Sequence, residues 1–417
     1  MSNQPNGRFS IIPVASELNN LPVENIVGEY LTHLKSIGGI IEREDYGKSG
    51  LPLFVFVITG GTEQRVLDLR QNKRDALNPV YLIAHPGNNS LPASLEILAK
   101  LQQENVKGRI FYLNSATKES PFEQIENAVK HIEVRNEMRK SKIGLIGPSS
   151  EWLVASMPDH EILERKWGPA IVPLQMSELI DLTQDVSDEE IEIPLKSFTA
   201  GAREIIEPSK KEIKNAVKVY SALKKMAWKH DLNAVAVRCF DLLTGLKTTG
   251  CYALAKLNDE GIVAGCEGDL VSTLGMFWVN RMTGSNVWMA NPAQADIETN
   301  SIWLAHCTVP VNMIGSYKLR SHFESGIGVG IEGEFEKGKV TLLRIGGKEL
   351  EKIWISEGEI MESGRAENLC RTQVHVHLSK EPGVSEFLDA PLGNHVILFR
   401  GKYKKHLQSW WETFIDN

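Results

Sequence analysis

The stretch that most constrains the fold is residues 51–58, which read Leu-Pro-Leu-Phe-Val-Phe-Val-Ile. Almost every position is apolar, whereas a strand with one solvated face alternates apolar and polar residues. We therefore expect a strand in the middle of a sheet that is covered on both faces. Such a strand is typical of α/β proteins, in which helices pack on both sides of a mainly parallel sheet.

The sequence around this stretch alternates in the same way. Strands are expected at residues 9–14, 79–84 and 108–113, and helices at 23–37, 91–103 and 122–139. A second series follows, with strands at 142–150, 170–174 and 233–238 and helices at 208–231 and 270–282. The acidic residues 184–192 are expected to form a solvated loop. The pattern predicts two doubly wound α/β layers, which we place in domains 1–140 and 141–310.

Beyond residue 310 the pattern changes to short strands separated by glycine-containing turns. They are expected at residues 326–334, 339–345, 351–356, 371–378 and 394–399, and a final helix at 403–414. This spacing predicts a small antiparallel β-barrel or sandwich in domain 311–417.

Charge and composition narrow the class of partner. The 417 residues are 42% hydrophobic and 24% charged, as in ordinary globular proteins, and the formal net charge is −7. Neither nucleic acid nor an anionic membrane is an expected partner, because both select basic surfaces. The amino terminus does not resemble a signal peptide, and no apolar run approaches the ~18 residues of a membrane span. We expect a cytoplasmic protein that binds a small molecule, with its five cysteines reduced, since their number is odd and no C-x-x-C spacing occurs.

The candidate site lies in residues 261–310. One short apolar run ends just before Glu267 and Asp269, and another ends at His306. Ligands collect beyond the carboxyl ends of such strands in α/β proteins. These three residues are therefore the first candidates, although Asp269 stands before an expected helix and can equally be its N-cap.

Three further loops carry candidate substrate contacts. Thr59, Gly60 and Gly61 follow the buried strand, where two glycines let backbone amides approach a sugar or a phosphate. Ser149 lies in the Gly/Ser-rich exit of the strand at 142–150 and Trp152 follows it, and both would face a cleft unless this is a plain strand-to-helix turn. Asp241 is another acid at a strand end.

Four motifs in order resemble those of the L-fucose isomerase and L-arabinose isomerase superfamily, and most closely its shorter fucose-isomerase-like branch. They are Glu267-Gly-Asp269, Trp288-Met-Ala-Asn291, Leu304-Ala-His306-Cys-Thr-Val-Pro and Leu392-Gly-Asn-His395. The resemblance covers roughly residues 230 to 400, and the preceding α/β layers agree in architecture only. Four ordered motifs are moderately specific, whereas any one of them would be weak.

The resemblance implies an enzyme that interconverts an aldose and a ketose with a divalent ion, commonly manganese. By position, Glu267 matches a metal-binding and acid/base glutamate, while His306 and His395 match metal-binding histidines. Asn291 stands where the family has a second carboxylate; its amide oxygen can bind a metal, but the amide cannot act as a base. Asp269 is our candidate for the second catalytic acid, with Asp241 and Asp296 as alternatives.

The resemblance also implies a homo-oligomer in which loops of one chain, such as residues 59–63 and 85–90, complete the site of a neighbour. Two alternatives to a sugar isomerase remain open. A lyase or an epimerase can use the same metal-enediolate chemistry. A sugar-binding protein that kept the fold and lost catalysis would explain Asn291.

Overall fold

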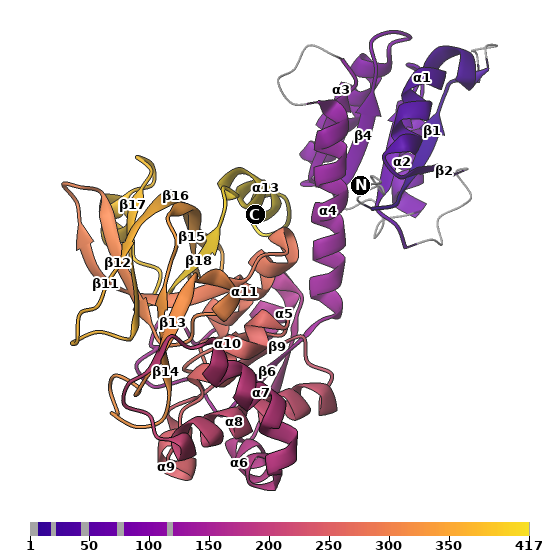
Figure 1. The fold of residues 1–417 in the computed structure, drawn as a ribbon. Coiled ribbons are helices and arrows are strands. Elements are labelled where there is room, and N and C mark those ends of the chain that lie inside the picture. The colour runs from indigo at the N-terminus through magenta and orange to yellow at the C-terminus, as the bar shows by residue number, and fades with distance from the viewer. Residues whose placement is uncertain (1–6, 18–21, 43–49, 73–78, 115–119, 417) are drawn as a thin grey trace. The chain divides into compact units, whose positions relative to one another are not determined.

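The computed structural model describes residues 7–17, 22–42, 50–72, 79–114 and 120–416. The chain divides into two compact units, Met1–Asn136 and Glu137–Asn417, and each is described by itself (Figure 1). Helix α4 (Pro121–Lys140) contains the boundary between them.

The first unit is a five-stranded parallel sheet in the order β2-β1-β3-β4-β5. Its strands are β1 (Phe9–Val14), β2 (Gly39–Ile41), β3 (Leu53–Val57), β4 (Val80–Ala84) and β5 (Gly108–Tyr112). Its other helices are α1 (Val23–Ser36), α2 (Glu63–Asn72) and α3 (Ser90–Gln103).

Helices cover both faces of this sheet. Phe54 and Phe56 of β3 pack with α1 and α4 on one face, and Val55 and Val57 pack with α2 and α3 on the other. All four side chains are fully buried, as the continuous apolar run predicts. The expected central strand and the doubly wound α/β layer are therefore confirmed.

The second unit begins with a four-stranded parallel sheet in the order β10-β9-β6-β7. Its strands are β6 (Lys142–Ile146), β7 (Ala170–Leu174), β9 (Ala234–Val237) and β10 (Val263–Gly265). The helices of this region are α5 (His160–Trp167), α6 (Met176–Asp185), α7 (Asp188–Gly201), α8 (Lys210–Lys229), α9 (Asp241–Leu246), α10 (Cys251–Asp259) and α11 (Leu270–Thr283).

The prediction of an acidic loop at residues 184–192 is wrong. Helix α6 ends at Asp185 and α7 begins at Asp188. Ser187 caps α7, because its Oγ accepts from the backbone N–H of Glu190 at 3.3 Å while Glu190 Oε1 accepts from the Ser187 N–H at 3.1 Å. The acidic residues therefore form a first helical turn, where the helix dipole favours negative charge.

A closed antiparallel barrel follows, in the order β11-β12-β17-β16-β15-β18 (Figure 1). Its strands are β11 (Val287–Asp296), β12 (Ser301–His306), β15 (Gly338–Gly346), β16 (Lys352–Ser363), β17 (Thr372–Leu378) and β18 (Val396–Arg400). The expected antiparallel barrel is confirmed. The barrel also includes β11 and β12, although both precede residue 311. The boundaries of the three expected domains stay a prediction.

The strand expected at residues 326–334 does not join the barrel. β14 (Gly330–Glu334) pairs with β13 (Ser316–Arg320), which pairs in turn with the short β8 (Glu204–Ile205). The remaining elements are the 3₁₀ helix η1 (Val311–Met313), α12 (Val384–Asp389) and the closing helix α13 (Lys404–Phe414).

Helix α11 joins the parallel sheet to the barrel. It begins directly after the turn that ends β10, and Gly275 in its middle lies so close to the barrel that a Cβ there would be 2.5 Å from Ile397 of β18. This contact brings the end of β10 to the end of β12 and the start of β18. Among the described residues, no helix is long and apolar enough to cross a membrane. The five cysteines are free thiols, as expected.

Candidate metal centre

Glu267 is presented by a tight turn between β10 and α11. Its φ is +61° and that of Gly268 is +67°, so two successive residues take the left-handed conformation. This conformation is uncommon for a residue with a side chain, and such outliers cluster at functional sites. Gly268 is required because a Cβ there would lie 2.9 Å from the carbonyl oxygen of Pro148.

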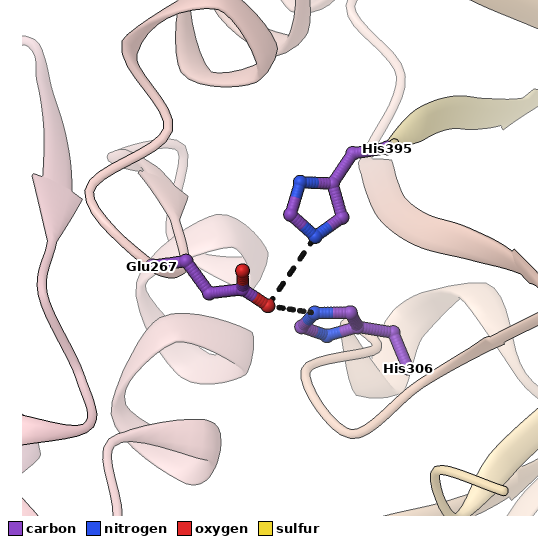
Figure 2. A group of neighbouring side chains, drawn as sticks. All are labelled: Glu267, His306 and His395. Carbon is purple, nitrogen blue, oxygen red and sulfur yellow. Dashed lines mark ion pairs between the residues drawn. The ribbon is translucent and has the colours of Figure 1, made fainter. Parts of the chain in front are cut away.

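The barrel supplies the two histidines. His306 is the last residue of β12, and His395 lies immediately before β18. Figure 2 shows both imidazoles directed at one oxygen of the Glu267 carboxylate. The Nε2 atom of His395 lies 3.3 Å from Glu267 Oε1, and that of His306 lies 3.8 Å from the same oxygen.

These three side chains have the geometry of a metal centre. Their ligand atoms all lie within 4.8 Å of one another, and among the described residues no other group of three His, Cys, Asp or Glu side chains does so. The exposed fractions are 8% for Glu267, 4% for His306 and 0% for His395. His395 Nε2 has no hydrogen-bond partner, which is costly for a buried polar atom unless a ligand satisfies it.

Asp269 lies behind His395. Its Oδ2 is 2.9 Å from His395 Nδ1, and its Oδ1 accepts from the backbone N–H of Ser272 at 2.8 Å, which caps α11. The capping role that the sequence left open for Asp269 is thus confirmed. The carboxylate is fully buried and also lies 3.4 Å from Nη1 of the fully buried Arg344.

The charges in this cluster stabilise one another. Burial acts to raise the pKa of Glu267, but the two imidazoles hold it well below its usual range. Burial likewise acts against ionisation of Asp269, yet Arg344 and His395 lower its pKa to about 2. Burial lowers the pKa of His395, but the carboxylates of Asp269 and Glu267 raise it overall to about 9. Both carboxylates are therefore ionised at neutral pH.

Two predicted substrate contacts lie at the same turn. Ser149 donates its Oγ–H to the carbonyl oxygen of Gly268 at 2.7 Å, and Trp152 donates its Nε1–H to Glu267 Oε2 at 2.6 Å. Asp241 is linked to this loop through Arg238. Its Oδ1 accepts from Nε of Arg238 at 3.0 Å, and Nη1 of Arg238 donates to the carbonyl oxygen of Ser149 at 3.0 Å.

Asn291 lies on β11 and pairs with Ala305 of β12, the residue before His306. Side chains two residues apart in a strand share a face. Asn291 therefore shares a face with Met289, whose Sδ accepts from the backbone N–H of Cys266 at 3.1 Å. Cys266 precedes Glu267 in sequence, so this face of β11 is the one that meets the Glu267 turn. Metal binding by Asn291 stays a prediction.

Thr59, Gly60 and Gly61 belong to the first unit, whereas Glu267 belongs to the second. They line a cavity of about 560 Å³ together with Asn88, Asn89 and neighbouring residues. Thr59 is held in place because its Oγ1 accepts from the backbone N–H of Ser16 at 2.7 Å. The structure thus places these predicted contact residues at a cavity of their own.

Arg344, in β15, is a residue of this cluster that was not predicted from the sequence. Its Nη1 donates to Ser272 Oγ at 2.6 Å and its Nη2 donates to Ser156 Oγ at 2.5 Å. A signal was present, because this arginine interrupts an otherwise largely apolar run at residues 340–345. A charged residue inside a buried strand requires a paired partner.

No protein family model matches the chain. It is similar to a curated sulfoquinovose isomerase of Alkalicoccus urumqiensis, with 20% identity over 306 residues, which are 70% of this chain and 67% of that protein. Sulfoquinovose isomerases of Priestia aryabhattai and Priestia megaterium are each 21% identical over 295 residues, which cover 67% of this chain and 64% of each relative. The chain therefore spans about two thirds of the length of these relatives.

Proposed function

We propose that the chain is a metal-dependent sugar isomerase that interconverts an aldose and a ketose. The observation that carries this proposal is the convergence of Glu267, His306 and His395 in one buried cluster. The curated relatives, all of which are named sulfoquinovose isomerase, also support this proposal. The four motifs that resemble the fucose and arabinose isomerases include these same three residues.

The residues fit a divalent ion. Glu267 Oε1 and the two Nε2 atoms would hold it, with Asn291 as a further proposed ligand. One carboxylate oxygen and two imidazole nitrogens form a mixed donor set that suits manganese, cobalt or zinc better than calcium. We infer manganese from the family resemblance. When bound, such an ion polarises the carbonyl and hydroxyl oxygens of a sugar.

Asp269 acts on His395 in this proposal. Its ionised carboxylate accepts the Nδ1–H of the imidazole, so when an ion displaces the second imidazole proton, the remaining proton would stay on Nδ1 and Nε2 would bind the ion. The Oδ2 atom already accepts hydrogen bonds from His395, Ser272 and Arg344. Asp269 is therefore a positioning residue rather than the second proton carrier.

Glu267 is the carboxylate that we propose to move a proton. Isomerisation through an enediol requires a base that takes a proton from one carbon and returns it to the next. Glu267 retains some exposure, whereas Asp269 has none. It is ionised at neutral pH, and Oε2 has a second lone pair beside the one that the Trp152 N–H occupies, so this oxygen can take up the proton.

A turnover assay tests this function. Metal-stripped protein would be incubated in D₂O with manganese and a panel of aldoses, beginning with sulfoquinovose because the relatives carry that name. We expect a ketose product that carries deuterium at the carbon to which the proton returns, and loss of turnover with a chelator. Turnover that persists without any divalent ion would contradict the metal dependence.

The alternative is a sugar-binding protein without turnover, and Asn291 is the observation that favours it. An amide beside the ion supplies no base. If Asn291 is the cause of missing catalysis, Asn291→Asp should create or raise isomerase activity and tighten manganese binding. Calorimetric sugar binding without turnover in the unmodified protein, followed by turnover in Asn291→Asp, would establish this alternative.

A further inference from the structure

The loop between β6 and α5 is fastened to the Glu267 turn. The backbone N–H of Ser150 donates to the carbonyl oxygen of Glu267 at 3.0 Å, and Ser149 Oγ donates to that of Gly268 at 2.7 Å. Arg238 holds the other side of the loop by donating to the carbonyl oxygen of Ser149. These bonds fix the position of Trp152, three residues after Ser149.

Trp152 gives the two oxygens of the Glu267 carboxylate different partners. Its single donor, Nε1–H, is bonded to Oε2 at 2.6 Å, which is short, as expected for a bond to an ionised acceptor. The other oxygen, Oε1, faces His306 and His395. With Oε2 occupied by the indole, Glu267 offers one oxygen to an ion rather than two.

Trp152 is also exposed to solvent. The residue is half exposed (50%), whereas Glu267, His306 and His395 are buried. Phe240 fixes the plane of the indole, because the two rings meet edge to face with centroids 5.2 Å apart. His322 lies on the far side of Phe240, with ring centroids 5.8 Å apart. The exposed indole thus lies beside the ligand atoms in a defined orientation.

We propose that Trp152 both positions Glu267 and recognises the sugar. The indole N–H holds Glu267 in one-oxygen coordination, and the exposed ring receives the C–H face of the sugar while the hydroxyl groups reach the ion. Binding sites combine aromatic surface with a few fixed polar groups in this way. This inference rests on the proposed function, and it commits the site to a substrate with an apolar C–H face.

Fluorine NMR tests the position of the indole without requiring turnover. All nine tryptophans would be replaced by 5-fluorotryptophan, and the signal lost in Trp152→Phe assigns Trp152. Trp228 is the matched control, because it is 67% exposed and contacts Lys224 on α8. We expect manganese to broaden the Trp152 signal and to leave that of Trp228 sharp, and sugar to shift the Trp152 signal. A Trp152 signal that responds to neither overturns the inference.

Substitutions separate the two roles. Trp152→Phe keeps a ring but removes the N–H, so manganese affinity should fall about tenfold while KM for the sugar at saturating manganese changes little. Trp152→Ala should also raise KM about tenfold, since the ring is lost. Trp228→Phe should change neither quantity. Equal KM values for Trp152→Phe and Trp152→Ala would refute the stacking role, and unchanged manganese affinity would refute the positioning role.

The outcomes distinguish this inference from the proposed function. If the unmodified protein turns over no sugar but manganese broadens the Trp152 signal, the position of the indole is upheld and the isomerase proposal fails. If turnover is robust and both Trp152 variants match the unmodified protein in manganese affinity and KM, the inference fails alone.

Discussion

His395 is held at Nδ1 by Asp269, and its Nε2 faces the Glu267 carboxylate. Partners behind a metal-binding imidazole fix its tautomer and orientation, and removing one typically weakens metal binding about 10- to 100-fold. The burial of Asp269 therefore changes its expected role. A proton carrier would affect turnover alone, whereas a positioning residue also affects the metal.

Asp269→Asn is expected to weaken manganese binding about 10- to 100-fold, because the amide can donate to Nδ1 and shift the imidazole proton to Nε2. Calorimetric titration of the metal-free protein measures this. Asp159→Asn is the matched control, since the exposed Asp159 likewise caps a helix, α5, by accepting from the backbone N–H groups of Glu161 and Ile162. Lost turnover with unchanged manganese affinity in Asp269→Asn would instead support a proton carrier.

The cluster residues were predictable from the sequence for a local reason. Glu267 follows a short apolar run, His306 ends one, and the motif that contains His395 precedes another. The roles of their neighbours were less accessible. The Asp269 contact with Arg344 joins residues 75 positions apart, and no local pattern specifies such a pairing.

Among the elements, β15 and α11 are linked by a buried charge pair. Arg344 extends from the barrel strand to the start of α11, where it donates hydrogen bonds to Asp269 and Ser272. Removing one partner of a buried ion pair leaves the other charge unpaired, which costs about 3–5 kcal/mol, whereas replacing both partners is far better tolerated.

Arg344→Met is accordingly expected to lower the free energy of unfolding by about 3–5 kcal/mol, as measured by urea denaturation. The double variant Arg344→Met/Asp269→Asn should recover part of that loss, because no unpaired charge remains. Arg203→Met is the control, since Arg203 forms an ion pair with Glu334 while its own side chain is 64% exposed. Equal losses for the single and the double variant would show that packing, and not charge, explains the effect.

Most elements followed from hydrophobic periodicity, and the exceptions have two causes. The continuous apolar run at residues 53–57 indicates a strand that is covered on both faces, as observed. The acidic residues at the start of α7 indicate a solvated loop if only their charge is considered. The Ser187–Glu190 capping box was visible in the sequence and outweighs that charge. The short β8 and β13 strands depend on tertiary pairing and carry little pattern of their own.

At the scale of the whole molecule, the first unit has a cavity of its own. Thr59, Gly60 and Gly61 line it, and the family resemblance suggests that such loops serve the site of a neighbouring chain. We expect a homo-oligomer, so light scattering should give a mass above the 46.5 kDa of one chain. A fully active monomer would contradict this.

Complementation tests shared sites more sharply. Gly60→Val should block the cavity, because a Cβ at Gly60 would lie 2.8 Å from that of Asn89. Glu267→Gln should remove the metal ligand. Each variant alone is expected to be inactive, but coexpressed chains should regain activity through sites that combine an intact loop with an intact Glu267. Normal turnover of Gly60→Val alone would place the cavity outside the reaction. Two inactive variants that stay inactive when coexpressed would show that the sites are not shared.

We propose that Glu267, His306 and His395 together hold a divalent ion, and a crystal structure of the protein with manganese, analysed by anomalous scattering, would locate that ion. We expect a single strong peak within about 2.5 Å of Glu267 Oε1 and of both Nε2 atoms, with Oε2 still bonded to Trp152. A peak elsewhere, or none at a manganese concentration that supports turnover, would show that these three residues do not form the metal site.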